Sequence, residues 1–79
     1  MKKYENKSNV MSNLIKETRL KKNMTKAEVC KQLQLHAVYL DVTELNRMET
    51  GKMIIKDFEL IGLCKVLDIE YNDLKNTIE

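Results

Sequence analysis

The sequence predicts an all-α protein, a compact bundle of about five short helices. The chain contains no proline and only two glycines, so it lacks most of the residues that form sharp turns. Apolar residues recur at three- and four-residue spacing in separate segments. Two of these segments open with a polar residue that is followed three positions later by glutamate, the signature of a capping box.

The length of the chain allows one hydrophobic core. At 79 residues it is too short for two domains, since a domain this small buries only ~60% of its unfolded surface. The polar, aperiodic segment over residues 1–8 is expected to be a flexible tail. A single domain is therefore expected over residues 9–79.

The first two predicted helices are separated by a polar break. A helix over residues 10–22 carries its apolar side chains on one face, and Asn23 can end it because asparagine tolerates the left-handed conformation. Thr25 and Glu28 form the first capping box, which places the second helix at residues 26–34. The residues expected to face inward here are Met24, Ala27, Val29, Cys30 and Leu33.

The third helix follows a long connection. Asp41 and Glu44 repeat the capping-box pattern, so a short helix is expected over residues 42–50, closed by Gly51. The connection before it, residues 34–40, is rich in apolar side chains that are expected to pack on the core. These are Leu35, Val38, Tyr39 and Leu40.

Two further helices are expected after Gly51. Asp57 can cap the fourth, whose inward side is expected to carry Phe58, Ile61, Cys64 and Leu67, with Gly62 allowing a neighbour to approach closely. The fifth is expected over residues 71–78, where Tyr71, Leu74 and Ile78 recur at helical spacing.

Composition excludes several classes of protein. Cys30 and Cys64 are expected to be reduced and buried, because with His36 they are too few and too widely spaced to bind zinc. No cofactor or small-molecule substrate is expected. A single histidine and the lack of a glycine-rich phosphate loop argue against an enzyme. The chain has no apolar run of ~18 residues and no apolar signal core, so a cytoplasmic protein without membrane contact is expected.

Three stretches of the chain together resemble the Xre/Cro family. They are IKETRLKKNMTKAEV (15–29), TELNRMETGK (43–52) and KDFELIGLCKVLDI (56–69). They match, in order, a helix 1 arginine, a threonine cap, a Glu-x-Gly run after the third helix and a leucine-rich fourth helix. The resemblance implies a lambda-repressor-like helix-turn-helix domain, with the motif at about residues 25–50. It also implies a transcription regulator, usually a repressor, that binds double-stranded DNA.

The resemblance also implies particular site residues. The helix at about residues 42–50 would read the major groove, and the helix before it would meet phosphate. The positions matching base contacts are Val42, Thr43, Glu44 and Arg47. The lysines placed to contact phosphate are Lys26, Lys52 and Lys56. Arg19 and Glu49 correspond to a structural ion pair of the family.

A homodimer is expected, because one short reading helix contacts too few base pairs for useful selectivity. The segment Tyr71 to Ile78 could form the dimer contact, or its apolar residues could lie within the core of the monomer.

Two departures from the family pattern leave a second interpretation open. The connection between the second and third helices is about five residues longer than usual, and the reading helix opens with Asp41 and Glu44. Acidic groups near phosphates weaken DNA binding. The net charge of +2 is only mildly basic and does not decide the question. The alternative is a protein-interaction module on the same fold, antitoxin-like or an antirepressor partner. A steep dependence of affinity on salt would indicate DNA binding instead.

Overall fold

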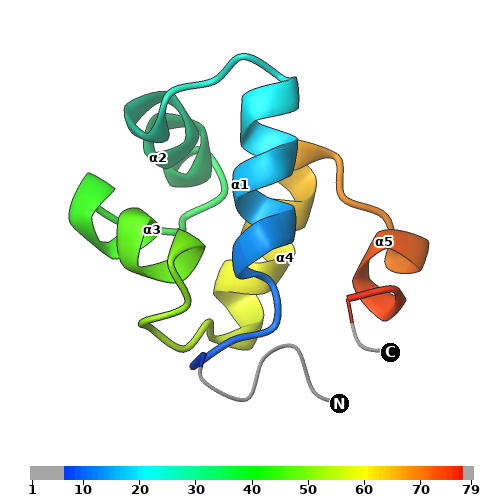
Figure 1. Ribbon diagram of the computed structural model, residues 1–79. Helices are drawn as coiled ribbons and strands as arrows, with labels where there is room; N and C mark the ends of the chain where they lie inside the picture. The colour runs from blue at the N-terminus through cyan, green and yellow to red at the C-terminus, as the bar shows by residue number, and fades with distance from the viewer. Residues whose placement is uncertain (1–6, 78–79) are drawn as a thin grey trace.

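The computed structural model describes residues 7–77, and this part of the chain forms five helices and no strand. The helices are α1 (Ser12–Lys21), α2 (Lys26–Gln34), α3 (Val42–Glu49), α4 (Asp57–Leu67) and α5 (Tyr71–Lys75). Helices α2 and α3 lie on one flank of α1 with α4 behind it, and α5 lies on the opposite side (Figure 1). The predicted all-α fold of about five short helices is confirmed.

Both predicted capping boxes are formed. The Glu28 amide donates to Thr25 Oγ1 over 3.1 Å, and the Thr25 amide donates to Glu28 Oε1 over 2.7 Å. The reciprocal pair between Asp41 and Glu44 has distances of 2.7 and 3.0 Å. Each box satisfies two amides, one of them an unpaired donor of the helix's first turn, which confirms the predicted starts of α2 and α3.

The cap predicted for α4 is wrong by one residue. The N-cap is Lys56, in extended conformation, and its amide donates to Glu59 Oε1 over 2.9 Å. The Asp57 carboxylate accepts only from the adjacent Phe58 amide, at 2.7 Å. Because Glu59 bonds back to residue 56, the chain enters the helix one position earlier than a cap at Asp57 would allow.

Four helices end in the same way, with one residue in the left-handed conformation. These residues are Asn23 (φ 56), Ala37 (φ 59), Gly51 (φ 77) and Asp68 (φ 56). The next residue donates its amide to the carbonyl five positions back, as in a Schellman motif. The pairs are Met24 to Arg19 (3.1 Å), Val38 to Leu33 (3.0 Å), Lys52 to Arg47 (2.8 Å) and Ile69 to Cys64 (3.0 Å). The ends at Asn23 and Gly51 were predicted, whereas those at Ala37 and Asp68 were not.

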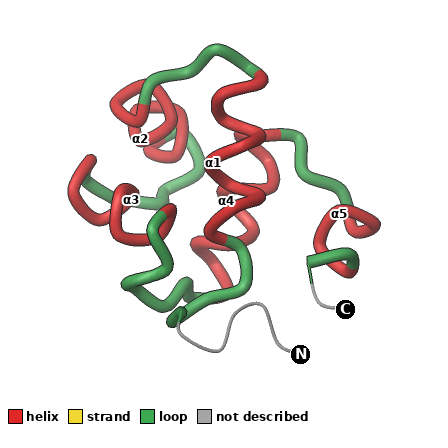
Figure 2. Tube along the Cα trace, viewed as in Figure 1, coloured by secondary structure: helices red, strands yellow, loops and turns green. Residues whose placement is uncertain are grey.

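The long connection between α2 and α3, residues 35–41, contains neither helix nor strand (Figure 2). Two of the four apolar residues that were expected to pack on the core do so. Val38 and Leu40 are buried, but Leu35 and Tyr39 are exposed, so the prediction was wrong for the latter two. Beyond the left-handed turn at Ala37 the chain is not helical. Its side chains then alternate between core and solvent, as in an extended segment.

The inward face of α4 also differs from the prediction. Phe58 and Ile61 are exposed, whereas Leu63, which was not predicted to face inward, is buried. Leu67 is buried, as predicted. Gly62 lies on the buried side, and a Cβ atom there would lie 2.9 Å from Val38 Cγ2 and 3.1 Å from Leu33 Cδ2. The expected close approach at Gly62 is therefore confirmed.

Other expected core positions were also corrected. Ala27 is exposed because the buried stripe of α2 passes through Val29, Cys30 and Leu33. Cys64 is only half-buried. The buried hydrophobic residues are Met11, Ile15, Val29, Cys30, Leu33, Val38, Leu40, Leu45, Met48, Leu63, Leu67 and Ile69.

Parts of two expected segments lie outside the described residues. These are residues 1–6 of the expected tail and Ile78 of the expected last helix. Within the described chain, Ser8 is hydrogen-bonded to Gly51, and α5 ends at Lys75. Tyr71 is exposed, whereas Leu74 packs against the core cluster.

Replacing Ala37 with glycine should stabilise the protein by roughly 0.5–1 kcal/mol. A left-handed residue with a Cβ atom is strained by about 1–2 kcal/mol, and glycine recovers part of this after its larger loss of backbone entropy. Ala27→Gly is the matched control, since Ala27 is exposed inside α2, and it should destabilise by about 1 kcal/mol. Urea unfolding followed by circular dichroism measures both. Destabilisation of similar size in the two variants would contradict the strain at Ala37.

Candidate nucleic-acid interface

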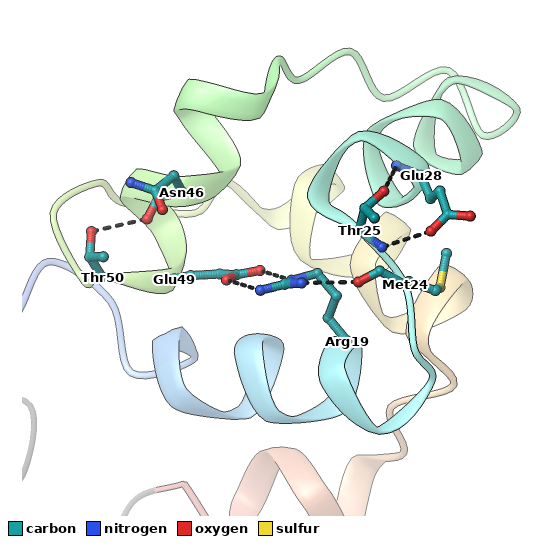
Figure 3. Close-up of polar contacts among 7 residues, drawn as sticks. All are labelled: Arg19, Met24, Thr25, Glu28, Asn46, Glu49 and Thr50. Carbon is teal, nitrogen blue, oxygen red and sulfur yellow. Dashed lines mark hydrogen bonds and ion pairs between the residues drawn. The ribbon is translucent and has the colours of Figure 1, made fainter.

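The side chains of Arg19 and Glu49 form a buried ion pair between α1 and α3 (Figure 3). Arg19 Nε donates to Glu49 Oε2 over 2.7 Å, and Nη2 donates to Oε1 over 3.0 Å. This two-bond geometry fixes direction as well as distance. The side-chain hydrogen bond to Glu49 raises the pKa of Arg19 above its ordinary value, although desolvation acts in the opposite direction.

Arg19 also contacts the start of α2. Its Nη1 donates to the carbonyl of Met24 over 3.0 Å, and Met24 directly precedes the Thr25 cap (Figure 3). A single side chain from α1 therefore joins the N-terminus of α2 to the C-terminal turn of α3. These are the two helices that correspond to the expected helix-turn-helix pair.

Helix α3 has a buried side and an exposed side. Leu45, Met48 and Glu49 point into the protein. Its exposed residues, Val42, Thr43, Asn46 and Arg47, recur at one- and four-residue spacing and so share one face. Three of the four residues expected to contact bases lie on this face. The fourth, Glu44, is half-buried, with one carboxylate oxygen bound to the Asp41 amide.

Asn46 is a further candidate for a base contact, although it was not among the residues expected to contact bases. It lies four positions after Val42, on the same exposed face, and this spacing was the signal that could have identified it. The neighbouring Thr50 hydroxyl donates to the carbonyl oxygens of Asn46 and Arg47, at 3.0 and 3.2 Å. The bond from Thr50 to Asn46 closes the last turn of α3 (Figure 3).

The three candidate phosphate-contacting lysines lie at helix starts and in one loop. Lys26 is the first residue of α2, where the partial positive charge of the helix end adds to that of its ammonium group. Lys52 and Lys56 are exposed at the two ends of the loop that joins α3 to α4. Lys56 Nζ also lies 6.0 Å from the centre of the Phe58 ring.

The cysteines are placed as packing groups. Burial raises the pKa of both thiols, and at Cys30 the charges of Asp41, Glu44 and Glu49 act in the same direction. Both thiols are therefore protonated near neutral pH. Residues 7–77 contain no group of three or more metal-ligating side chains, and none of their helices is long and apolar enough to cross a membrane.

A sequence model of the family described as "Helix-turn-helix" matches residues 15–74, most of α1 and α5 and all of α2, α3 and α4. The chain belongs to the Xre/lambda-repressor-like helix-turn-helix family. The resemblance seen in the sequence is thereby confirmed, and with it a DNA-binding helix-turn-helix protein. Domains of this family are DNA-binding regulatory modules and are not typically enzymes. No curated protein and no solved structure matches the chain.

Removing the Glu49 carboxylate should destabilise the domain by about 3–5 kcal/mol, because it leaves the Arg19 charge buried without a partner. Glu17→Ala, an exposed change of equal charge on α1, should stay within about 0.5 kcal/mol of the parent. The double variant Arg19→Met, Glu49→Leu should recover most of the loss, since apolar residues of similar volume often replace a buried pair at little cost. Thermal and urea unfolding measure all three. Equal effects of Glu49→Ala and Glu17→Ala would show that the pair does not matter for stability.

Proposed function

We propose that this protein is a sequence-specific transcription regulator that reads the major groove of double-stranded DNA with α3. One observation carries the proposal: α3 has a single exposed face whose side chains are of types able to contact bases, and a buried two-bond ion pair anchors the helix. An α-helix fits the major groove, where each base pair presents a distinct pattern of donors and acceptors.

The side chains of the exposed face suit different bases. Arg47 can bond guanine bidentately, and Asn46 can do the same with adenine. Val42 can contact a thymine methyl group, and Thr43 can bond a base or a phosphate. Glu44 retains one free carboxylate oxygen that could accept from cytosine.

Phosphate contacts would come from Lys26, Lys52 and Lys56. Such contacts give affinity and register on the duplex, while base contacts give specificity. Lys26 stands at the N-terminus of α2, where the unpaired amides and the helix dipole both favour an anion.

The acidic residues at the start of α3 are expected to repel DNA phosphates less than the sequence alone suggests. Each places a carboxylate oxygen on a backbone amide of the capping box. The alternative, a protein-interaction module that uses the same face, would gain from the exposed side chain of Val42. Selection of bound sequences from a random duplex pool, followed by affinity measurements over a range of salt, separates the two. Counterion release makes DNA affinity fall steeply with salt, whereas apolar contact with a protein shows little such slope.

We further propose that the protein represses transcription and acts in the cytoplasm. Repression requires only that the bound protein occupy DNA needed by the polymerase. The contacts assigned above are sufficient for that role. In vitro transcription from a promoter that carries the selected operator tests it.

Arg47→Ala should lower affinity for the selected operator by about 1–3 kcal/mol and relax base preference at one position of each half-site. Lys26→Ala is the contrasting variant of equal charge, and it should weaken binding to all duplexes alike and reduce the salt slope by about 1. Competition binding against operators with single base changes measures both. A uniform loss for Arg47→Ala, or a sequence-selective loss for Lys26→Ala, would reverse the two assignments.

We propose that the DNA-bound form is a symmetric homodimer, with half-sites about 34 Å apart or a multiple of that spacing. The contact would involve the segment Tyr71 to Ile78, in which apolar residues recur at helical spacing and Tyr71 is 73% exposed on α5. Tyr71→Asp should therefore weaken dimer formation on the operator. Tyr39→Asp should not, although Tyr39 is 74% exposed on the connection between α2 and α3. Sedimentation with labelled operator gives the stoichiometry, and an intact chain bound to its best operator as one monomer would rule the dimer out.

A further inference from the structure

We propose that Asn9 is a positioning residue for α3 in DNA recognition, an inference that rests on the function proposed above. The Asn9 side-chain amide makes three hydrogen bonds. Nδ2 donates to the carbonyl oxygens of Met48 and Met53, over 3.1 and 2.8 Å. Oδ1 accepts from the Met11 amide over 2.8 Å.

These three partners belong to different parts of the interface. Met11 is the N-cap of α1, Met48 lies in the last turn of α3, and Met53 lies in the loop that carries Lys52 and Lys56. Asparagine has one acceptor oxygen and two donor hydrogens. Asn9 uses the acceptor for an amide at the start of α1 and the donors for one carbonyl at the end of α3 and one in the following loop, so its short side chain joins these three places.

The two residues before Asn9 contact Gly51, which directly follows the last turn of α3. The Ser8 amide donates to the Gly51 carbonyl over 2.7 Å. The stem of Lys7 covers Gly51 so closely that a Cβ atom there would lie 2.7 Å from Lys7 Cγ. The start of the described chain passes beside the loop between α3 and α4 (Figure 1). Gly51 is thus required twice, for its left-handed φ of 77° and for this contact.

Asn9 and Arg19 attach α3 to α1 at two separate points. Met11 and Arg19, the residues at which these attachments reach α1, are eight positions apart, or roughly 12 Å along a helix. On α3 the two attachments meet adjacent residues, Met48 and Glu49, and they reach this turn from two different places on α1. Together with the buried side chains of Leu45 and Met48, they limit how the end of α3 can move. Arg19 holds Glu49 by its side chain, and Asn9 holds Met48 by its carbonyl.

The direction of α3 matters more for base contacts than for phosphate contacts. Hydrogen bonds to base edges require donor–acceptor distances within a few tenths of an ångström. Flexible lysines can follow a phosphate when the helix shifts. Loss of the Asn9 bonds should therefore reduce operator affinity more than affinity for random duplex.

The test compares Asn9→Asp with Gln34→Glu in the full chain. Aspartate keeps the acceptor for the Met11 amide but loses both donors and places a carboxylate against two carbonyl oxygens. Gln34 is exposed at the end of α2, and its side chain makes no hydrogen bond within residues 7–77, so its change to glutamate controls for the added charge. Binding to the selected operator and to random duplex is measured at a temperature where circular dichroism shows both variants to be folded.

Relative to Gln34→Glu, we expect Asn9→Asp to bind the operator at least tenfold more weakly and random duplex within threefold. Equal operator affinity of the two variants, or equal loss on both duplexes, would overturn the positioning role. If Asn9→Asp does not fold, Asn9→Ser, which keeps an acceptor for Met11, is judged against the parent chain by the same two ratios. Failure of the unaltered chain to bind any duplex would instead refute the proposed function itself.

Discussion

The three contacts of the Arg19 guanidinium determine how the two helices of the motif are held. Two of them bind the Glu49 carboxylate at the end of α3, and the third binds the Met24 carbonyl at the start of α2. A buried ion pair adds little net stability compared with apolar residues, but it has a direction that apolar packing lacks. The pair therefore contributes most to the placement of the exposed face of α3.

Helix ends account for much of the remaining architecture. With no proline and only two glycines, the chain uses asparagine, alanine and aspartate at three of its four left-handed helix ends. Ala37 has no side-chain polar group to compensate for that conformation, and its turn begins the extended part of the long connection to α3. The connection lengthens the motif, yet its residues Val38 and Leu40 pack on the core. The longer connection is thus a packed part of the fold.

The arrangement of charges supports DNA recognition better than their sum does. A net charge of +2 provides little attraction for a polyanion, but lysines stand at the start of α2 and at both ends of the loop after α3. The carboxylates of Asp41 and Glu44 are bound to backbone amides at the start of α3, which limits their repulsion of phosphate. Arg47 and Asn46 remain on the exposed face, with Asn9 and Arg19 holding the helix behind them.

The sequence by itself determined the features that depend on neighbouring residues. Capping boxes act within four positions, so the starts of α2 and α3 were predictable at Thr25 and Asp41, as was the left-handed end at Gly51. Only the tertiary structure decided which side of α4 is buried. Apolar residues lie on every side of this helix, and the side that is buried brings Gly62 against Val38, which is 24 positions away in the chain. Asn9 could not be predicted for the same reason. Its side chain donates to Met48 and Met53, which are 39 and 44 positions away in the chain, and no local sequence pattern indicates these contacts.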